Sequence, residues 1–184
     1  MTFQDQEFID RDPRIERVLI GSTDLQRRVT ELGREISSEY TSEDRPILVS
    51  ILKGGVIFLS DLVRSITIPH EFDFMAVSSY TGQNTTGVVK INMDLQASIT
   101  DRHVLIVEDI VDTGLTLDHL LELLSSRKPT SLRTCTLLNK VDARRKEVRI
   151  DHKGFDIPDE FVIGYGLDYN EQYRNLPFVG VLRG

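Results

Sequence analysis

Three carboxylates follow an apolar run in the middle of the chain. The stretch VLIVEDIVDTGLT, residues 104–116, begins with branched apolar residues typical of a buried strand and then contains Glu108, Asp109 and Asp112. Burying charge is unfavourable unless a partner compensates it. In open parallel sheets, ligands bind beyond the carboxyl ends of the strands, where these acids are expected to lie. An isolated acid pair often only ends a strand in solvent, but the loop that follows favours a ligand site here.

The loop after Asp112 has the composition of a phosphate-binding turn. Gly114 lets the backbone bend and present successive N–H groups, and Thr113 and Thr116 add hydroxyl donors. The helix expected next brings partial positive charge at its N-terminus. The stretch lacks the G-x-x-x-x-G-K-S/T pattern of ATPases, so we expect a phosphate monoester. A phosphate beside carboxylates further requires sugar hydroxyls, a divalent cation such as magnesium, or both.

Strands that alternate with helices are expected to position this site. Apolar runs predict strands at residues 46–52, 103–109, 132–140, 161–166 and 178–183. Residues 70–79 and 88–95 are expected to pair antiparallel across the polar connection between them. This alternation indicates an α/β protein with a largely parallel sheet and helices on both of its faces.

Helices are predicted where apolar residues recur at helical spacing. Residues 23–40 carry a stripe formed by Leu25, Val29, Leu32 and Ile36. Thr23 and Gln26 are spaced as a capping box at the start of this helix. A second helix is expected within residues 56–66, and a third follows the phosphate loop with Leu117, Leu120, Leu121 and Leu124 on one face.

Composition limits the possible classes of protein. The 184 residues with 40% hydrophobic content suit one domain. A formal net charge of -7 disfavours a nucleic-acid partner, and the basic run at 143–146 is taken as a solvated connection. No apolar run approaches the roughly 18 residues of a membrane span, so a cytoplasmic protein without a membrane partner is expected. Cys135, the only cysteine, is predicted to be a core residue in a reducing compartment.

The stretch 104–116 resembles the phosphoribosyl-diphosphate signature of the type I phosphoribosyltransferases: an apolar run, two acids, and a short acid-Thr-Gly-x-Thr loop. Other segments are similar to the hypoxanthine-guanine phosphoribosyltransferases, particularly the bacterial ones. They are ILKGG at 51–55, SSY at 78–80, LLNK at 137–140, and GFDIPDEFVIGYGLDYNEQYRNLPFVGVL at 154–182. The resemblance covers nearly the whole chain from residue 15 onward.

The resemblance implies a fold and a reaction. The fold is the type I phosphoribosyltransferase fold in a single domain, residues 1–184, with a central, largely parallel sheet flanked by helices. A flexible lid loop is expected at about 79–90, and a small hood from the N-terminal segment and residues about 150–184. The reaction transfers the 5-phosphoribosyl group from phosphoribosyl diphosphate to hypoxanthine or guanine, and gives IMP or GMP and diphosphate. It requires Mg²⁺, and a homotetramer or homodimer is the expected assembly.

The resemblance also implies roles for the acids and the loop. Glu108 and Asp109 are expected to hold the ribose hydroxyls and the magnesium shell. The 5-phosphate is expected to bind Asp112, Thr113, Gly114, Leu115 and Thr116. Relatives often have a polar residue at the position of Leu115, but a contact through its backbone N–H survives an apolar side chain. Asp112 is the expected catalytic acid/base at purine N7, whose proton becomes more acidic as the new bond forms at N9.

The remaining implied roles concern the purine and the diphosphate. Lys140 is expected to donate to the purine 6-oxo group, which selects against the 6-amino group of adenine. The other purine-binding residues are Phe161, which stacks on the base, Val162, which reads its far edge, and Asp168, which also reaches a second magnesium through water. The expected diphosphate-binding residues are Lys53, Gly54, Arg174, Ser79 and Tyr80. In the family, the peptide before the lysine of the LKGG loop is cis.

Two other functions fit parts of the pattern. A nucleotide-responsive regulator on the same fold would keep the phosphate site, but 184 residues leave no room for an appended helix-turn-helix. A phosphoacceptor receiver-type domain would explain acids at strand ends. It leaves DTGLT, LKGG and LDYNEQYR without a role, so the enzyme is the favoured interpretation.

Overall fold

The computed structural model describes residues 2–79 and 89–183, and the side chains of residues 3, 4, 79 and 89 are also outside it. Within these residues the helices are α1 (Phe3–Arg11), α2 (Ser22–Glu39), α3 (Gly55–Ser65) and α4 (Leu115–Ser125). The strands are β1 (Ile15–Ile20), β2 (Ile47–Leu52), β3 (Glu71–Ser79), β4 (Val89–Met93), β5 (His103–Val111), β6 (Ser131–Lys140), β7 (His152–Ile157), β8 (Val162–Ile163) and β9 (Val179–Leu182).

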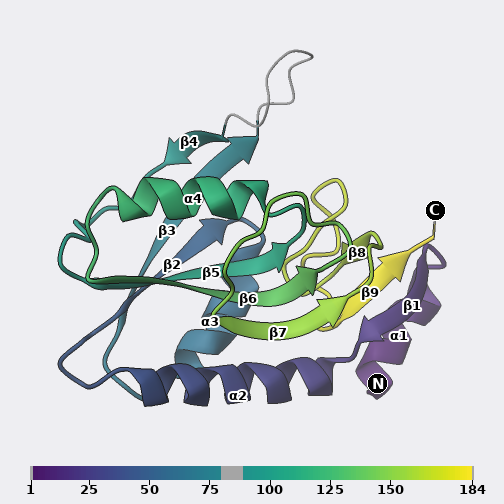
Figure 1. Cartoon of the computed structure of the whole chain (residues 1–184). Helices are drawn as coiled ribbons and strands as arrows, with labels where there is room; N and C mark the ends of the chain where they lie inside the picture. Colours follow the sequence, from purple (N-terminus) through teal and green to yellow (C-terminus); the bar gives the residue numbers. More distant parts are fainter. Residues whose placement is uncertain (1, 80–88, 184) are drawn as a thin grey trace, which may run out of the picture.

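A six-stranded sheet forms the centre of the molecule, in the order β4-β3-β2-β5-β6-β7 (Figure 1). All of its neighbouring pairs are parallel except β3 and β4, which pair antiparallel. Helices α2 and α3 pack on one face, and α4 packs on the other. The predicted α/β class and the predicted antiparallel pair are therefore confirmed.

Branched apolar residues explain why β2 and β5 lie at the centre. Leu48, Val49, Leu105 and Ile106 are fully buried, because helices cover both faces of the sheet. Cys135 in β6 is also fully buried, as predicted. The carboxyl ends of β2, β5 and β6 consequently meet at one edge of the sheet, where the acidic stretch ends.

A second, antiparallel sheet of order β1-β9-β8 joins the N-terminal and C-terminal parts of the chain. Phe178 is fully buried beneath it and lies 6.2 Å, edge to face, from Phe8 of α1. The strands predicted at 161–166 and 178–183 belong to this sheet, and β8 is only two residues long. Of the range 150–184, β7 belongs to the large sheet, and β8 and β9 belong to the small one.

The capping box predicted for α2 is wrong. The helix begins one residue earlier, at Ser22, with Gly21 as its N-cap and no capping side chain. A capping box is instead present in α1, where Thr2 and Asp5 bond each other's backbone N–H groups. Thr23 lies inside the helix and not at its N-cap position, and the Ser22 N–H donates to Oδ2 of Asp5 over 3.4 Å.

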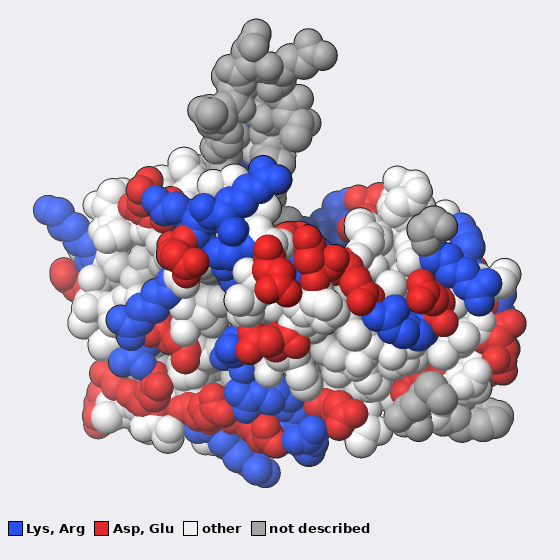
Figure 2. Space-filling view, turned by 45° about the vertical axis from the view of Figure 1, so that its right-hand side comes forward, with Lys and Arg blue, Asp and Glu red and all other residues white. Residues whose placement is uncertain are grey.

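Surface properties agree with the charge pattern. On the face drawn in Figure 2, acidic and basic side chains are interspersed, and the described Lys and Arg residues there do not gather into one extended patch. No described helix combines the length and the apolar character that a bilayer crossing needs.

Candidate active site

A cavity of about 370 Å³ opens at the carboxyl edge of the large sheet. It brings together residues from β2, β5, β6, β8 and the loop before β9. Its lining includes Lys53, Gly54, Glu108, Asp109, Asp112, Lys140, Phe161, Val162, Asp168 and Arg174, all of which the sequence singled out. The chain therefore gathers residues more than 100 positions apart around one space.

The phosphate loop forms an adjoining cavity of about 240 Å³. Asp112, Thr113, Gly114 and Thr116 line it together with Glu108. Gly114 has φ +84° and is the N-cap of α4, so the first N–H groups of that helix follow directly. Leu115 does not line this cavity and the residue is 44% exposed, so only its backbone is left to serve a bound anion.

Glu108 is a buried carboxylate, with 7% of its surface exposed. Burial, followed by repulsion from Asp109, raises the pKa of Glu108 well above its usual range. Burial also raises the pKa of Asp109 to about 6, although the N–H of Ile110 donates to this carboxylate over 2.9 Å. Neither acid forms an ion pair with a described cation. The pair is thus an uncompensated acidic site inside the cavity.

Gly54 lets the loop after β2 approach these acids. A Cβ atom at this position would lie 1.8 Å from Oδ2 of Asp109, so no other residue fits without displacement. The peptide between Leu52 and Lys53 is cis. The close approach of Gly54 to Asp109 places the loop backbone directly beside the acidic pair.

Lys140 lies at the end of β6 with only 8% of its side chain exposed. Its Nζ is 3.2 Å from Oδ2 of Asp112 and 3.4 Å from Oδ1 of Asp159. Two carboxylates therefore compensate one buried ammonium. Asp159 was not predicted, because a single acid after Pro158 in a loop has no periodicity or motif that marks it.

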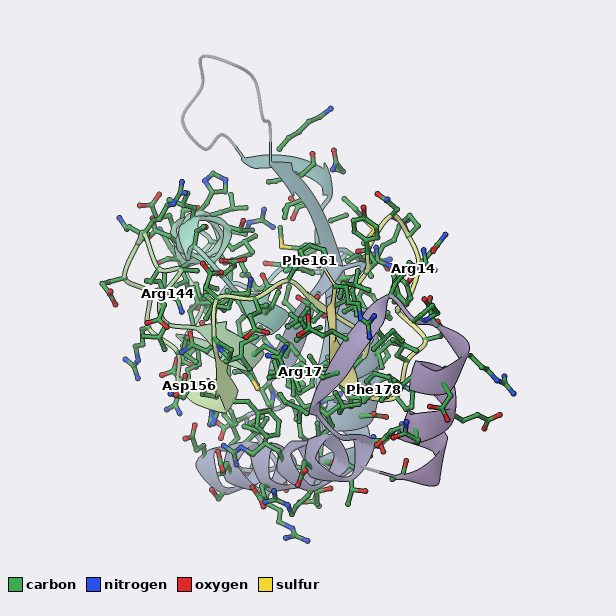
Figure 3. All side chains as sticks on the ribbon, turned by 90° about the vertical axis from the view of Figure 1, so that its right-hand side faces the viewer. Arg14, Arg17, Arg144, Asp156, Phe161 and Phe178 are labelled. Carbon is green, nitrogen blue, oxygen red and sulfur yellow. The ribbon has the colours of Figure 1, made fainter. Side chains whose placement is uncertain are left out.

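Phe161 is exposed at the cavity mouth, whereas its neighbour Val162 is buried in β8. The Phe161 ring lies 5.7 Å from the ring of Tyr169 at an angle of 84°, so this contact uses at most one face of the Phe161 ring. Figure 3 shows Phe161 between the region of Arg144 and Asp156 and the opposite region of Arg14. A flat ring that enters the cavity would meet this side chain.

Arg174, Asp168 and Lys53 form the outer wall of the cavity. Arg174 donates from Nη1 to the Gly166 carbonyl over 2.8 Å, and its Nη2 is 2.8 Å from Oδ1 of Asp168. Glu171, which was also not predicted, lies 3.1 Å from Nζ of Lys53 and 3.3 Å from Nη2 of Arg174. In contrast to the inner acids, every charge in this wall has a partner.

The basic run at 143–146 is more than a solvated connection. The backbone N–H groups of Arg145 and Lys146 both donate to the carbonyl of Thr113, over 3.0 and 3.1 Å. The Arg144 guanidinium donates to the Asn139 side chain, and a Cβ on Gly114 would lie 2.3 Å from the Lys146 carbonyl. The run therefore packs against the phosphate loop and occupies the Thr113 carbonyl.

The expected lid falls largely outside the described residues. Ser79 ends β3, but its side chain is not described, and Tyr80 lies in the undescribed range 80–88. Among the residues that are described, no three His, Cys, Asp or Glu side chains are placed to hold a metal ion together.

Comparison with known proteins identifies the class. The sequence profile of the phosphoribosyl transferase domain matches residues 22–170. The hypoxanthine-guanine phosphoribosyltransferase of Mycobacterium avium is 53% identical over 175 residues, which cover 91% of this chain and 86% of that protein. The enzyme of the same name from Bacillus subtilis is 48% identical and covers 92% of this chain and 94% of its own length.

Solved structures agree with these relatives. A crystal structure of a hypoxanthine phosphoribosyltransferase from Staphylococcus aureus superposes with a TM-score of 0.89 and 45% identity, covering 93% of each chain. The Trypanosoma cruzi enzyme, solved with its product IMP, gives a TM-score of 0.88 at 39% identity over 94% of this chain and 96% of its own. The chain therefore belongs to the phosphoribosyltransferases, and within them to the hypoxanthine-guanine phosphoribosyltransferase family. These comparisons give no support to the alternative of a regulator.

Proposed function

We propose that this protein is a purine salvage enzyme that transfers the 5-phosphoribosyl group from phosphoribosyl diphosphate to hypoxanthine or guanine. One observation carries the proposal. A buried, uncompensated acid pair, a phosphate loop and a buried lysine share adjoining cavities. A phosphorylated sugar satisfies the first two, because its hydroxyls donate to the acids while its phosphate occupies the loop. The lysine then faces the base.

Asp112 and Lys140 are proposed to act on the purine. In the reaction, the bond from C1 of the ribose to the diphosphate oxygen breaks, and a bond from C1 to purine N9 forms. Asp112 accepts the N7 proton, which becomes more acidic as N9 bonds to C1. Lys140 donates to the 6-oxo oxygen, Phe161 stacks on the base and the backbone of Val162 reads its far edge. The ion pair of Lys140 with Asp159 leaves the lysine a counter-ion when Asp112 becomes neutral.

Mg²⁺ fits the donor set. Glu108 and Asp109 offer carboxyl oxygens that form no ion pair with a described cation, and oxygen is the ligand that Mg²⁺ prefers. Mg²⁺ typically binds one or two carboxylates together with substrate phosphates, so a complete protein cage is not required. We propose that these two acids hold one ion and that Asp168 reaches a second through water. The ion would neutralise the leaving diphosphate.

The outer wall is proposed to bind the diphosphate through Lys53, the Gly54 backbone and Arg174. A guanidinium offers a fork of donors suited to phosphate oxygens. Ser79 and Tyr80 are proposed to contact the closed complex from a lid at about 79–90. Lid closure would protect a ribose with oxocarbenium character from attack by water.

The assembly and setting are also proposals. One solved relative at a TM-score of 0.89, from Trypanosoma cruzi, was studied for the role of its C-terminal region in oligomeric state and activity. We propose a homodimer or homotetramer of single-domain chains in the cytoplasm, with small-molecule substrates as its ligands. Sedimentation of the pure protein would distinguish the two assemblies.

The decisive test is a spectrophotometric assay with phosphoribosyl diphosphate and magnesium. Hypoxanthine, guanine, xanthine and adenine are offered separately, with and without a chelator. Nucleotide should form from the 6-oxopurines hypoxanthine and guanine, should not form from adenine, and should disappear with the chelator. Tight binding of a purine nucleotide without turnover of any base would contradict the enzyme and favour a regulator.

A further inference from the structure

Glu171 joins the two cations of the outer wall. One of its oxygens, Oε2, lies 3.1 Å from Nζ of Lys53 and 3.3 Å from Nη2 of Arg174. These cations stabilise the charged carboxylate and lower the pKa of Glu171, and Lys53 contributes more than Arg174. The carboxylate thus stands where an anionic group that bridges both cations would place an oxygen.

A tight turn at residues 169–172 fixes the position of this carboxylate. Asn170 and Glu171 have φ of +51° and +62°, a left-handed conformation that side-chain-bearing residues seldom adopt. The N–H of Glu171 donates to Oδ2 of Asp168 over 2.9 Å and secures the turn. Two consecutive residues in this conformation form the turn of a tight hairpin, in which Tyr169 and Gln172 exchange backbone hydrogen bonds of 3.1 Å.

Arg174 is held without help from Glu171. Its Nη1 donates to the Gly166 carbonyl, and its Nη2 also meets Asp168. Lys53 and Glu171 have side chains that are 67% and 64% exposed, so their ion pair is weak and easily exchanged. Loss of the Glu171 charge should therefore free the cations without disordering the guanidinium.

We propose that Glu171 is a positioning residue that occupies Lys53 and Arg174 in the free enzyme and competes with diphosphate for them. This inference rests on the proposed function, in which both cations bind diphosphate. The N–H donors that face Glu171 cannot serve a diphosphate oxygen at the same time, so the carboxylate must turn into solvent when the substrate binds. The same exchange in reverse would help the product diphosphate to leave.

The experiment measures diphosphate binding by calorimetry with magnesium present, for wild type, E171Q and E171A. The matched control is E31Q, because Glu31 also bridges two cations, Arg27 and Arg28, over 3.3 and 3.1 Å in α2. Both Gln variants change the net charge equally. IMP is the second ligand, because it fills the base and phosphate positions but lacks the diphosphate.

Both Glu171 variants should bind diphosphate roughly two- to fivefold more tightly than wild type, as expected for the loss of competing exposed ion pairs. The KM for phosphoribosyl diphosphate should fall in parallel, while IMP affinity and the behaviour of E31Q should stay unchanged. Unchanged or weaker diphosphate binding by E171Q and E171A, with an active wild type, would overturn the inference alone. An equal gain in E31Q would also overturn it. An inactive wild type would instead remove the proposed function on which it rests.

Discussion

The inner and outer walls of the cavity treat charge in opposite ways. On the inner wall, Glu108 and Asp109 are desolvated and form no ion pair with a described cation, although the charge of Arg174 acts on Asp109. On the outer wall, Lys53, Arg174, Asp168 and Glu171 form a continuous series of ion pairs near solvent. The unpaired acids of the inner wall therefore reduce the stability of the free protein, whereas the charges of the outer wall already have partners.

Because of this difference, we expect the two walls to have different roles in binding. The unpaired acids gain most when a ligand supplies hydroxyl donors or a cation, so they favour binding of the substrate and its metal. The outer wall gains little binding energy from an anion until one of its own acids moves away from the cations. Binding energy should then come mainly from the inner wall and the phosphate loop, and control of diphosphate exchange from the outer wall.

Asp112→Asn should have the largest effect. It leaves the loop backbone and Lys140 in place but removes the base that accepts the N7 proton, so kcat should fall by about 10³-fold. Binding of phosphoribosyl diphosphate should change little. Steady-state kinetics with hypoxanthine and calorimetry with phosphoribosyl diphosphate measure the two quantities. Full activity of this variant would remove Asp112 as the acid/base.

Gly54→Ala tests the close approach between the loop after β2 and Asp109. Its Cβ would lie 1.8 Å from Asp109, so the loop or the acid must shift, and misplacement of this size should lower kcat/KM for phosphoribosyl diphosphate by about 10²-fold. Thermal unfolding checks that the variant remains folded. Normal kinetics in a folded variant would show that the close approach of the loop has no role.

Lys140→Gln tests the part of the cavity where the purine is proposed to bind. The variant loses a charged donor to the 6-oxo group, so kcat/KM for hypoxanthine should fall roughly tenfold. Selection against adenine should weaken, because an amide can both donate and accept. Competition between hypoxanthine and adenine measures the ratio. Unchanged rejection of adenine would refute the assignment.

A substitution of His152, which lies outside the cavity, should have the smallest effect and should change only the pH dependence of stability. It is 3% exposed, and burial lowers its pKa below 6.5 despite nearby acids, of which Glu39 lies 3.3 Å from Nε2. The unfolded chain therefore binds this proton more readily, and stability should fall as the pH decreases below about 6.5. His152→Gln should flatten that part of the Tm profile, whereas the control His119→Gln should not. A profile identical to that of wild type would contradict the burial argument.

Local patterns predicted the large sheet and the phosphate loop well. The apolar run before Glu108 and the turn at Gly114 are properties of adjacent residues, and the structure places them as a strand end and a helix N-terminus. The small sheet is different, because β1 and β9 are more than 150 residues apart and pair only after the chain folds. Local spacing alone cannot indicate such a pairing.

The missed residues have a common cause. Glu171 and Asp159 are exposed acids in loops, and their type and spacing are ordinary for solvated positions. Their importance comes from the cations that distant elements bring to them. The basic run at 143–146 was underestimated for the same reason, since it contacts Thr113 through its backbone rather than through its charges.

Thermal unfolding of wild type and Glu108→Gln, each with and without phosphoribosyl diphosphate and magnesium, measures both the cost of the buried acid and its contribution to ligand binding. Glu108 is buried for the ligand at a cost to the free protein, because burial and the neighbouring Asp109 disfavour its charged form and raise its pKa. The free variant should unfold at a higher temperature than wild type at neutral pH, because a Gln side chain needs neither the proton uptake nor the buried charge that Glu108 requires there. Its ligand-induced increase in Tm should be smaller, because the ligand binds it more weakly. A variant that is less stable than wild type when free, or whose Tm rises as much with the ligand as that of wild type, would contradict this role of Glu108.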